Sequence, residues 1–140
     1  MKKSGVILLD PSMKKVLVVR GKKFIDKSGN IYPEGIFSFP KGHINEEESY
    51  VHCALRELYE ETNINVHISR CDPSIILGDG LYFVKFVNFH DIKYKIKNRS
   101  EITKISWKNI EDIKQLCCNK SVREFAKRFD SLILTKLNSH

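Results

Sequence analysis

Apolar residues along the chain gather in short runs separated by polar segments, and their spacing predicts strands in the first third. Two β-rich runs, Val6–Leu9 and Lys15–Arg20, flank a turn signal that contains Pro11, a pattern typical of a hairpin. An exposed polar loop is expected over residues 21–35. Ile36–Phe39 follows as a short predicted strand.

The second half of the chain predicts further strands. Gly78–Gly80 supplies a turn between the predicted strands Ile64–Ile68 and Leu81–Phe89, and Ile102–Trp107 is expected to form another strand. Ile110–Leu116 is expected to form a short helix. Short strands separated by turns are therefore predicted over most of the chain.

Two segments carry the apolar spacing of longer helices. In Ser49–Thr62, apolar residues recur at i, i+3, i+4 and i+7 and form one stripe. In Ser121–Leu137, a second stripe includes Val122, Phe125 and Phe129, and most of the cations lie off it. Several short strands interleaved with two longer helices predict a mixed α+β domain.

Composition limits the number of domains and the class of protein. The chain has 140 residues, of which 41% are hydrophobic and 29% charged, so we expect one domain over 1–140 and not a disordered segment. No apolar run approaches the roughly 18 residues of a membrane span, and the first residues lack a signal-peptide pattern. The four cysteines form no Cys-x-x-Cys pair. We therefore expect free thiols in the cytoplasm, with the nucleus left open.

The charge balance favours phosphate-rich ligands. The chain has 24 Lys and Arg against 17 Asp and Glu, a net charge of +7, which suits nucleic acids and nucleotides. The excess lies in Lys22–Lys27, in Lys93–Arg99 and in the last predicted helix. The histidines show no zinc-ligand spacing with the cysteines, so we exclude a zinc site. The sequence predicts no membrane contact and no particular protein partner.

Three acids on the first predicted helix are candidate metal ligands. Glu57, Glu60 and Glu61 stand at i, i+3 and i+4, so their carboxylates project from one face, about 120° from the apolar stripe. Three like charges this close repel one another, and a hard divalent cation such as Mg²⁺ or Mn²⁺ would neutralise them. The alternative is a solvated acidic face on which Arg56 pairs with Glu60.

The wider pattern favours the metal site over this alternative. Six residues stand at fixed spacings in this segment: Gly42, Glu48, Arg56, Glu57, Glu60 and Glu61. A random window of sequence would carry all six residue types at these spacings with a probability of about 1 in 10⁷. The segment Gly42–Ile64 resembles the signature of the Nudix hydrolases, in which a glycine and a spaced glutamate precede Arg-Glu-apolar-x-Glu-Glu-x-Gly. Asn63 stands at the last glycine of that signature, and Asn is the next best residue for the left-handed conformation expected there.

The resemblance implies a fold, a cofactor and a set of site residues. The fold is an αβα sandwich with a central mixed sheet and a loop–helix–loop motif. The cofactor is Mg²⁺ or Mn²⁺. The implied ligands are Glu57, Glu60, Glu61, Glu101 and Gly42. The implied catalytic residues are Glu57, Glu61, Glu101 and Lys41, with Glu48 and Arg56 in supporting roles.

Segments outside the signature are similar to two subgroups of the family. Pro40-Lys41-Gly42 looks like mRNA-decapping catalytic domains and asymmetric diadenosine tetraphosphate hydrolases, and Cys53-Ala54-Leu55-Arg56-Glu57 is similar to Cys-Ala-x-Arg-Glu of decapping enzymes. Ser100–Trp107 resembles the decapping segment whose glutamate completes the metal site, a role that falls on Glu101. The predicted substrate-binding cations are Lys41, Arg20, Lys120, Arg123 and Lys127.

These observations predict a pyrophosphohydrolase that cleaves the 5′ cap of RNA or a related nucleoside polyphosphate. Dinucleoside polyphosphates and diphosphoinositol polyphosphates stay open as substrates. A non-catalytic RNA-binding module is the alternative of another class, because the chain is basic and carries Asn63. Phe24, Tyr32, Tyr82 and Trp107 are candidates for stacking on a base, although each of these residue types more often fills a core or a loop.

Overall fold

The computed structural model describes residues 2–78 and 80–129, and its centre is a mixed β-sheet. The strands are β1 (Lys3–Asp10), β2 (Lys15–Arg20), β5 (Phe37–Ser38), β6 (Lys41–His43), β7 (Ser74–Leu77), β8 (Gly80–Phe86) and β9 (Lys104–Asn109). Their order is β5-β2-β1-β8-β7, with β6 also paired to β1 and β9 to β2. β1 and β8 are parallel, and the other pairs are antiparallel.

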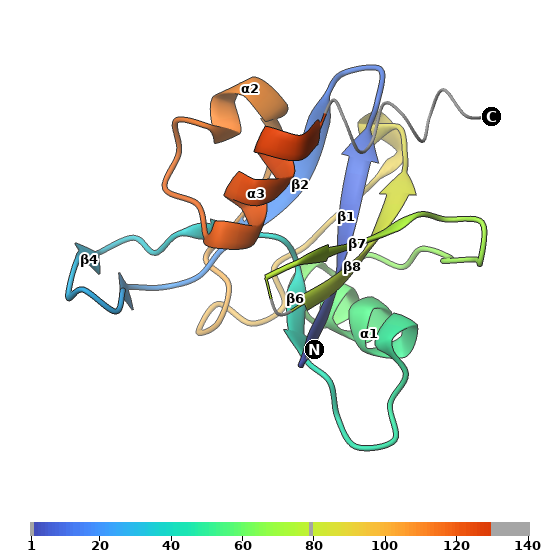
Figure 1. The fold of residues 1–140 in the computed structure, drawn as a ribbon, viewed down its shortest axis with the longest axis horizontal. Helices are drawn as coiled ribbons and strands as arrows, with labels where there is room; N and C mark the ends of the chain where they lie inside the picture. Colours follow the sequence, from blue (N-terminus) through green and yellow to red (C-terminus); the bar gives the residue numbers. More distant parts are fainter. Residues whose placement is uncertain (1, 79, 130–140) are drawn as a thin grey trace.

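Helices cover both faces of this sheet (Figure 1). Along β1 the side chains alternate: Val6 and Leu8 pack with α1 (Tyr50–Thr62), whereas Ile7 and Leu9 pack with the helices on the other face. Those helices are α2 (Ile110–Ile113) and α3 (Lys120–Phe129). The expected αβα sandwich is confirmed.

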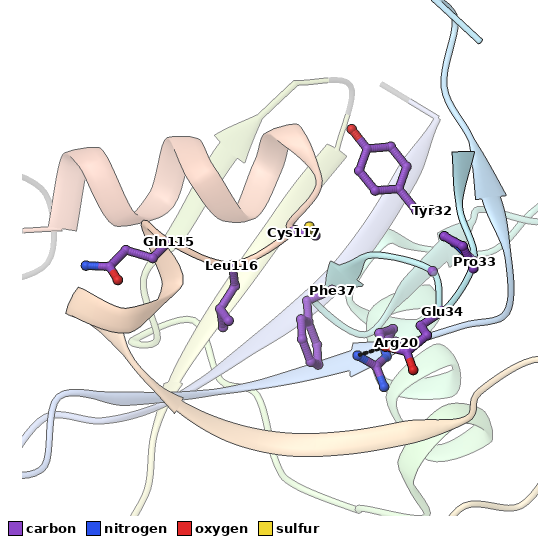
Figure 2. Close-up of a pocket in the computed structure, with 9 residues that line it drawn as sticks. Arg20, Tyr32, Pro33, Glu34, Phe37, Gln115, Leu116 and Cys117 are labelled. Atoms are coloured by element: carbon purple, nitrogen blue, oxygen red, sulfur yellow. Dashed lines mark ion pairs between the residues drawn. The ribbon is translucent and has the colours of Figure 1, made fainter. Parts of the chain in front are cut away.

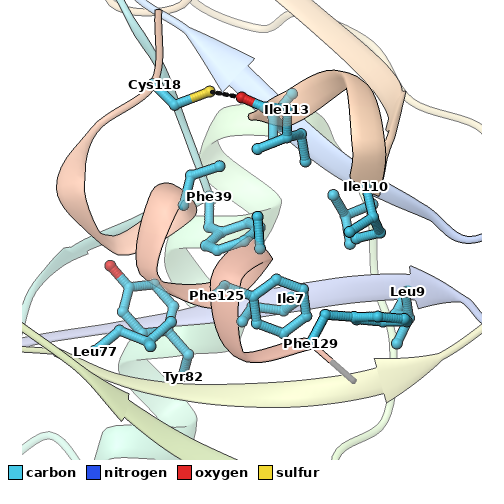
Figure 3. Packing of buried hydrophobic residues seen from close by; sticks show 14 of the residues in the cluster. Ile7, Leu9, Phe39, Leu77, Tyr82, Ile110, Ile113, Cys118, Phe125 and Phe129 are labelled. Atoms are coloured by element: carbon cyan, nitrogen blue, oxygen red, sulfur yellow. Dashed lines mark hydrogen bonds between the residues drawn. The ribbon is translucent and has the colours of Figure 1, made fainter. Parts of the chain in front are cut away.

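The core beneath α3 is built on aromatic contacts (Figure 3). The ring of Phe125 meets Phe39 edge-on at 5.4 Å between centroids, and Phe39 meets Tyr82 at 5.8 Å. Tyr82 is fully buried, so of the four aromatic residues considered for base stacking it belongs to the core. Within the described residues no helix is long and apolar enough to cross a membrane.

The structure corrects two of the predicted elements and adds a strand. The segment Ile64–Ile68 is not a strand, because the sheet edge beside β8 is taken by β7, which the sequence did not predict. Ile64 is nevertheless buried against the core, which explains its apolar character without strand pairing. The predicted loop over 21–35 contains a small hairpin of β3 (Phe24–Ile25) and β4 (Ile31–Tyr32), which extends away from the sheet (Figure 1).

Other boundaries differ by less. β6 was also not predicted, and α2 ends at Ile113, three residues before the predicted end. A 3₁₀ turn, η1 (Phe89–Asp91), follows β8. Of the predicted helix Ser121–Leu137, the part after Phe129 lies outside the described residues.

The end of α1 confirms the expected conformation of Asn63. Its φ of 62° and ψ of 20° lie in the left-handed region, and its N–H donates to the Tyr59 carbonyl oxygen at 2.8 Å. This is the position that glycine most often occupies at a helix end. The replacement of glycine by asparagine therefore preserves the backbone at the end of the motif.

We predict a difference between two substitutions at this exposed position. Asn63→Gly should keep or slightly raise the free energy of unfolding, because glycine has no Cβ to strain. Asn63→Ala should lower it by about 1 kcal/mol. Urea denaturation in metal-free buffer measures both, and equal stabilities of the two variants would contradict this account.

Candidate active site

The loop–helix–loop motif is held by an N-cap at one end of α1 and by apolar packing along its length. The Ser49 side chain accepts a hydrogen bond from the His52 N–H at 3.1 Å, which satisfies one of the free donors at the helix start. Ala54 and Leu58 are buried against the sheet. The apolar face of α1 is thereby fixed, and the acidic face beside it is turned toward β6.

Arg56 links the loop before α1 to the helix and to β6. It donates to both carboxylate oxygens of Glu48, at 2.7 and 3.0 Å, a bidentate arrangement that fixes orientation as well as distance. It also donates to Glu57 at 2.9 Å, to Glu60 at 3.2 Å and to the His43 carbonyl oxygen at 3.2 Å. The supporting positions predicted for Glu48 and Arg56 are therefore those of an ion pair that organises the motif.

This ion pair shifts both groups toward their charged forms. The hydrogen bonds from Arg56 and from the Asn45 N–H lower the pKa of Glu48 to about 2. The same contact with Glu48 raises the pKa of Arg56 above its ordinary value. Glu48 has an exposed side-chain fraction of only 8%, so its charge is screened little by water.

Three carboxylates come together beside this network. Glu57 and Glu61 from α1 and Glu101 from the loop before β9 each place an oxygen within 4.8 Å of the others. These three residues are called the acidic cluster below. Oxygen ligands from several carboxylates at short range suit a hard cation such as Mg²⁺ or Mn²⁺. The donor set thus fits the predicted cofactor.

Burial raises the pKa values of the helix members of this cluster when no cation neutralises them. Burial, followed by the neighbouring Glu57 charge, raises the pKa of Glu61 to about 9. Burial also raises the pKa of Glu57, and the nearby Arg56 opposes that shift. Lys41 opposes the shift of Glu61, which places its ammonium within electrostatic range of the cluster.

Gly42 makes room for the cluster. A Cβ at this position would overlap the carboxyl group of Glu57, so only glycine lets that side chain lie against β6. The Gly42 carbonyl oxygen, its predicted metal donor, accepts a hydrogen bond from the Cys53 thiol at 3.6 Å. Glycine at this position therefore has a steric reason that holds with or without metal ligation.

Glu60 lies differently from the other predicted ligands. Its carboxylate faces Arg56 and has an exposed fraction of 52%, and it is not part of the acidic cluster. This is the contact that the alternative of a solvated acidic face predicted for Glu60. Metal ligation by Glu60 stays a prediction, and it requires the side chain to turn away from Arg56.

A cavity extends from Lys41 toward the predicted substrate-binding cations. It has a volume of about 340 Å³, and its walls include Lys3, Lys22, Lys41, Phe24 and Asn119. Phe24 and Asn119 also line a neighbouring cavity of about 640 Å³, together with Lys120 and Arg123. The sequence did not single out Lys3 or Asn119, because only the tertiary structure brings their segments beside Lys41. The pairing of β6 with β1 places Lys3 there, and the Asn119 N–H donates to the Phe37 carbonyl oxygen of β5 at 2.9 Å.

Arg20 lines a third cavity, of about 580 Å³, between the segment from Tyr32 to Phe37 and residues 115–117 after α2 (Figure 2). Its guanidinium lies 5.1 Å from the centroid of the Phe37 ring and 3.9 Å from the Glu34 carboxylate. Its Nε is buried and has no hydrogen-bond partner among the described residues. Lys127 is exposed on α3 and lines none of these three cavities.

Known proteins resemble this chain in sequence and in fold. It is 37% identical over 123 residues to the mRNA decapping complex subunit 2 of Schizosaccharomyces pombe, an alignment that covers 83% of this chain and 15% of that protein. It is 36% identical to the m7GpppN-mRNA hydrolase dcap-2 of Caenorhabditis elegans, with 78% and 14% covered. The chain thus spans about a seventh of the length of these two relatives.

The fold has a counterpart among solved structures. An Ap4A hydrolase of Caenorhabditis elegans superposes with a TM-score of 0.66 at 19% identity, covering 96% of this chain and 99% of the other. At this identity the likeness concerns the fold.

The model of the NUDIX domain matches residues 2–129. The match confirms the resemblance drawn from Gly42–Ile64, and the chain belongs to the NUDIX domain family.

Proposed function

We propose that this chain is a divalent-metal-dependent pyrophosphohydrolase that cleaves the 5′ cap of RNA. The observation that carries the proposal is the acidic cluster together with Lys41, which lies within electrostatic range of Glu61 and lines a cavity with the further cations Lys3 and Lys22. The similarity to two decapping proteins supports capped RNA as the substrate. Ap4A and other nucleoside polyphosphates contain the same phosphoric anhydride bond and are the alternatives to be measured.

Each residue of the site has a role that its position supports. Glu57, Glu61 and Glu101 hold the cation, with Glu60 as a further predicted ligand. A bound Mg²⁺ or Mn²⁺ supplies positive charge next to the phosphate oxygens and lowers the pKa of coordinated water. Lys41 contributes a second positive charge toward the phosphate chain. Glu101 is exposed and is therefore the cluster member best placed to accept a proton from the attacking water.

The remaining predicted cations extend this substrate surface. Lys120 and Arg123 line the cavity that adjoins the one at Lys41, so they are placed to contact phosphates farther along the substrate. Arg20 and Lys127 are proposed as additional contacts to the phosphates of the substrate. Phosphate contacts of this kind add affinity without reading bases. A cytoplasmic location stays a prediction.

A substrate panel tests the proposal directly. With Mn²⁺ present, the protein should release m⁷GDP from capped RNA faster than it cleaves diadenosine tetraphosphate, because only the RNA carries further phosphodiester-linked nucleotides that the cations toward α3 can contact. Chromatography of the radiolabelled products measures both reactions. Turnover of the dinucleotide without release of m⁷GDP would assign the chain to the alternative substrate class.

Substitutions at single carboxylates test the metal assignment. Glu61→Gln should reduce the turnover by at least about a hundredfold, since even residues that only support a ligand often contribute 10–100-fold. Glu46→Gln is the matched control, because Glu46 is exposed in the loop before α1. Glu60→Gln should weaken metal binding only if Glu60 is a ligand. Full activity of Glu61→Gln would refute the assignment of the acidic cluster as the metal site.

Burial of Glu61 predicts how the stability of the metal-free protein depends on pH. The folded state holds a proton on Glu61 up to a pKa of about 9, whereas the unfolded chain releases it near pH 4.5. Stability should therefore fall as pH rises from about 5 to about 9, with a slope approaching 1.4 kcal/mol per pH unit from this group.

Urea denaturation in EDTA across this pH range measures the slope. Glu61→Gln, which carries no titrating proton at residue 61, should flatten it, and Glu46→Gln should not. Saturating Mn²⁺ should reverse the trend in the native protein, because the cation binds the deprotonated carboxylates. Equal slopes for the native protein and Glu61→Gln would show that Glu61 titrates normally.

A further inference from the structure

A row of exposed cations leads along the loop between η1 and the acidic cluster. Lys93, Lys95, Lys97 and Arg99 occupy alternate positions and are exposed, and they are called the cationic strip below. Between them, Ile96 is partly buried and packs against the core beneath α1, as Ile92 does at the start of the loop. The apolar anchors thus hold the loop to the protein while the cations face solvent.

Hydrogen bonds fix the strip between the end of α1 and the acidic cluster. The Lys95 N–H donates to the carbonyl oxygen of Thr62, the last residue of α1, at 2.9 Å. The N–H groups of Glu101 and Ile102 donate to the Asn98 carbonyl oxygen at 3.2 and 3.0 Å. The strip therefore ends two residues before Glu101, whose carboxylate belongs to the acidic cluster.

The strip has no neutralising carboxylate within residues 2–78 and 80–129. Among the described residues, none of its four cations forms an ion pair with a carboxylate. Glu60, the exposed acid that follows Tyr59 on α1, is itself paired with Arg56. Four unpaired like charges on one short loop repel one another, and a polyanion would relieve that repulsion.

Two exposed tyrosines accompany these charges. Tyr59 on α1 and Tyr94 within the loop have exposed fractions of 39% and 43%. The Lys97 ammonium lies over the Tyr59 ring, 3.6 Å from its centroid, so the ring lies directly beside the strip. Cations that follow a backbone, together with aromatic faces on which bases stack, are the features that bind single-stranded nucleic acid.

We propose that the cationic strip, with Tyr59 and Tyr94, binds the single-stranded RNA body that follows the cap. This rests on the proposed function, which places the cap phosphates at the acidic cluster. The nucleotides downstream then leave the cluster past Glu101 and run along the α1 side of the sheet. This route differs from the one predicted along α3, which packs on the opposite face of the sheet.

Binding along the strip should have three separable properties. The strip contacts phosphates, so binding along it depends on salt and not on base sequence. The tyrosines stack on bases, so unpaired RNA is preferred over a duplex, whose bases are not available for stacking. The cap dinucleotide lacks the downstream nucleotides, so the strip contributes to the affinity for capped RNA and not to the affinity for the dinucleotide.

The test measures RNA affinity without relying on catalysis. Binding of a fluorescent, uncapped single-stranded RNA is followed by anisotropy in EDTA over a range of salt concentrations. The strip variant is Lys95→Ala with Lys97→Ala. The matched control is Lys14→Ala with Lys114→Ala, which removes the same charge beside α2, since the Ile110 N–H donates to the Lys14 carbonyl oxygen. A third pair, Lys120→Ala with Arg123→Ala, probes the route along α3.

The strip variant should weaken RNA binding roughly tenfold at low salt and reduce the slope of log affinity against log salt by about 1.4, or about 0.7 per contact. Tyr94→Ala should weaken binding about fivefold and leave that slope unchanged, because stacking involves no counterion. Turnover of the cap dinucleotide should be equal in the strip variant and the native protein.

Three results would contradict the proposal. If the strip variant binds RNA as tightly as the matched control, the strip is not the RNA site. If only the Lys120 and Arg123 pair lowers affinity, the RNA follows α3 instead. If inorganic polyphosphate competes as well as RNA and Tyr94→Ala has no effect, the strip is a general anion surface. Because binding is measured in EDTA, an absence of hydrolysis would overturn the proposed function and leave this result standing.

Discussion

The bidentate ion pair between Arg56 and Glu48 holds the catalytic motif in one conformation. Arg56 contacts the loop through Glu48, the helix through Glu57 and Glu60, and β6 through the His43 carbonyl oxygen. Charge-assisted bonds in a bidentate arrangement restrict direction as well as distance. Because one guanidinium joins all three segments, the place of the Glu57 carboxylate against Gly42, and with it the acidic cluster, depends on this side chain.

The charge distribution follows from the same arrangement. The chain carries a net charge of +7, yet its site gathers three carboxylates, two of them with pKa values raised by burial. The surplus of cations lies around this cluster, in Lys41, in the cavities toward α3 and in the cationic strip. A substrate with a chain of phosphates matches such a surface, because its charge would meet cations on the approach and the proposed metal site at the bond to be cleaved.

Local residue patterns in the sequence were enough to predict the parts of the fold that depend on neighbours along the chain. The apolar stripe predicted α1 to within one residue at its start, and Asn63 takes the left-handed conformation expected of it. Short apolar runs on either side of a turn predicted β1 and β2. Strand pairing depends on residues far apart in sequence, so β6 and β7 were missed and Ile64–Ile68 was taken for a strand although it only packs on the core.

For the site, the sequence by itself determined the catalytic motif, because the spacing of Gly42, Glu48, Arg56 and the helix carboxylates is set by a short loop and one helix. Only the tertiary structure decided which carboxylates meet. Glu60 shares a helix face with Glu57 and Glu61, yet it turns to Arg56, and Glu101 takes its place from a loop forty residues away in the chain. Helix periodicity sets the direction in which a side chain leaves the backbone, whereas its partner is chosen by whatever other segments the fold packs beside it.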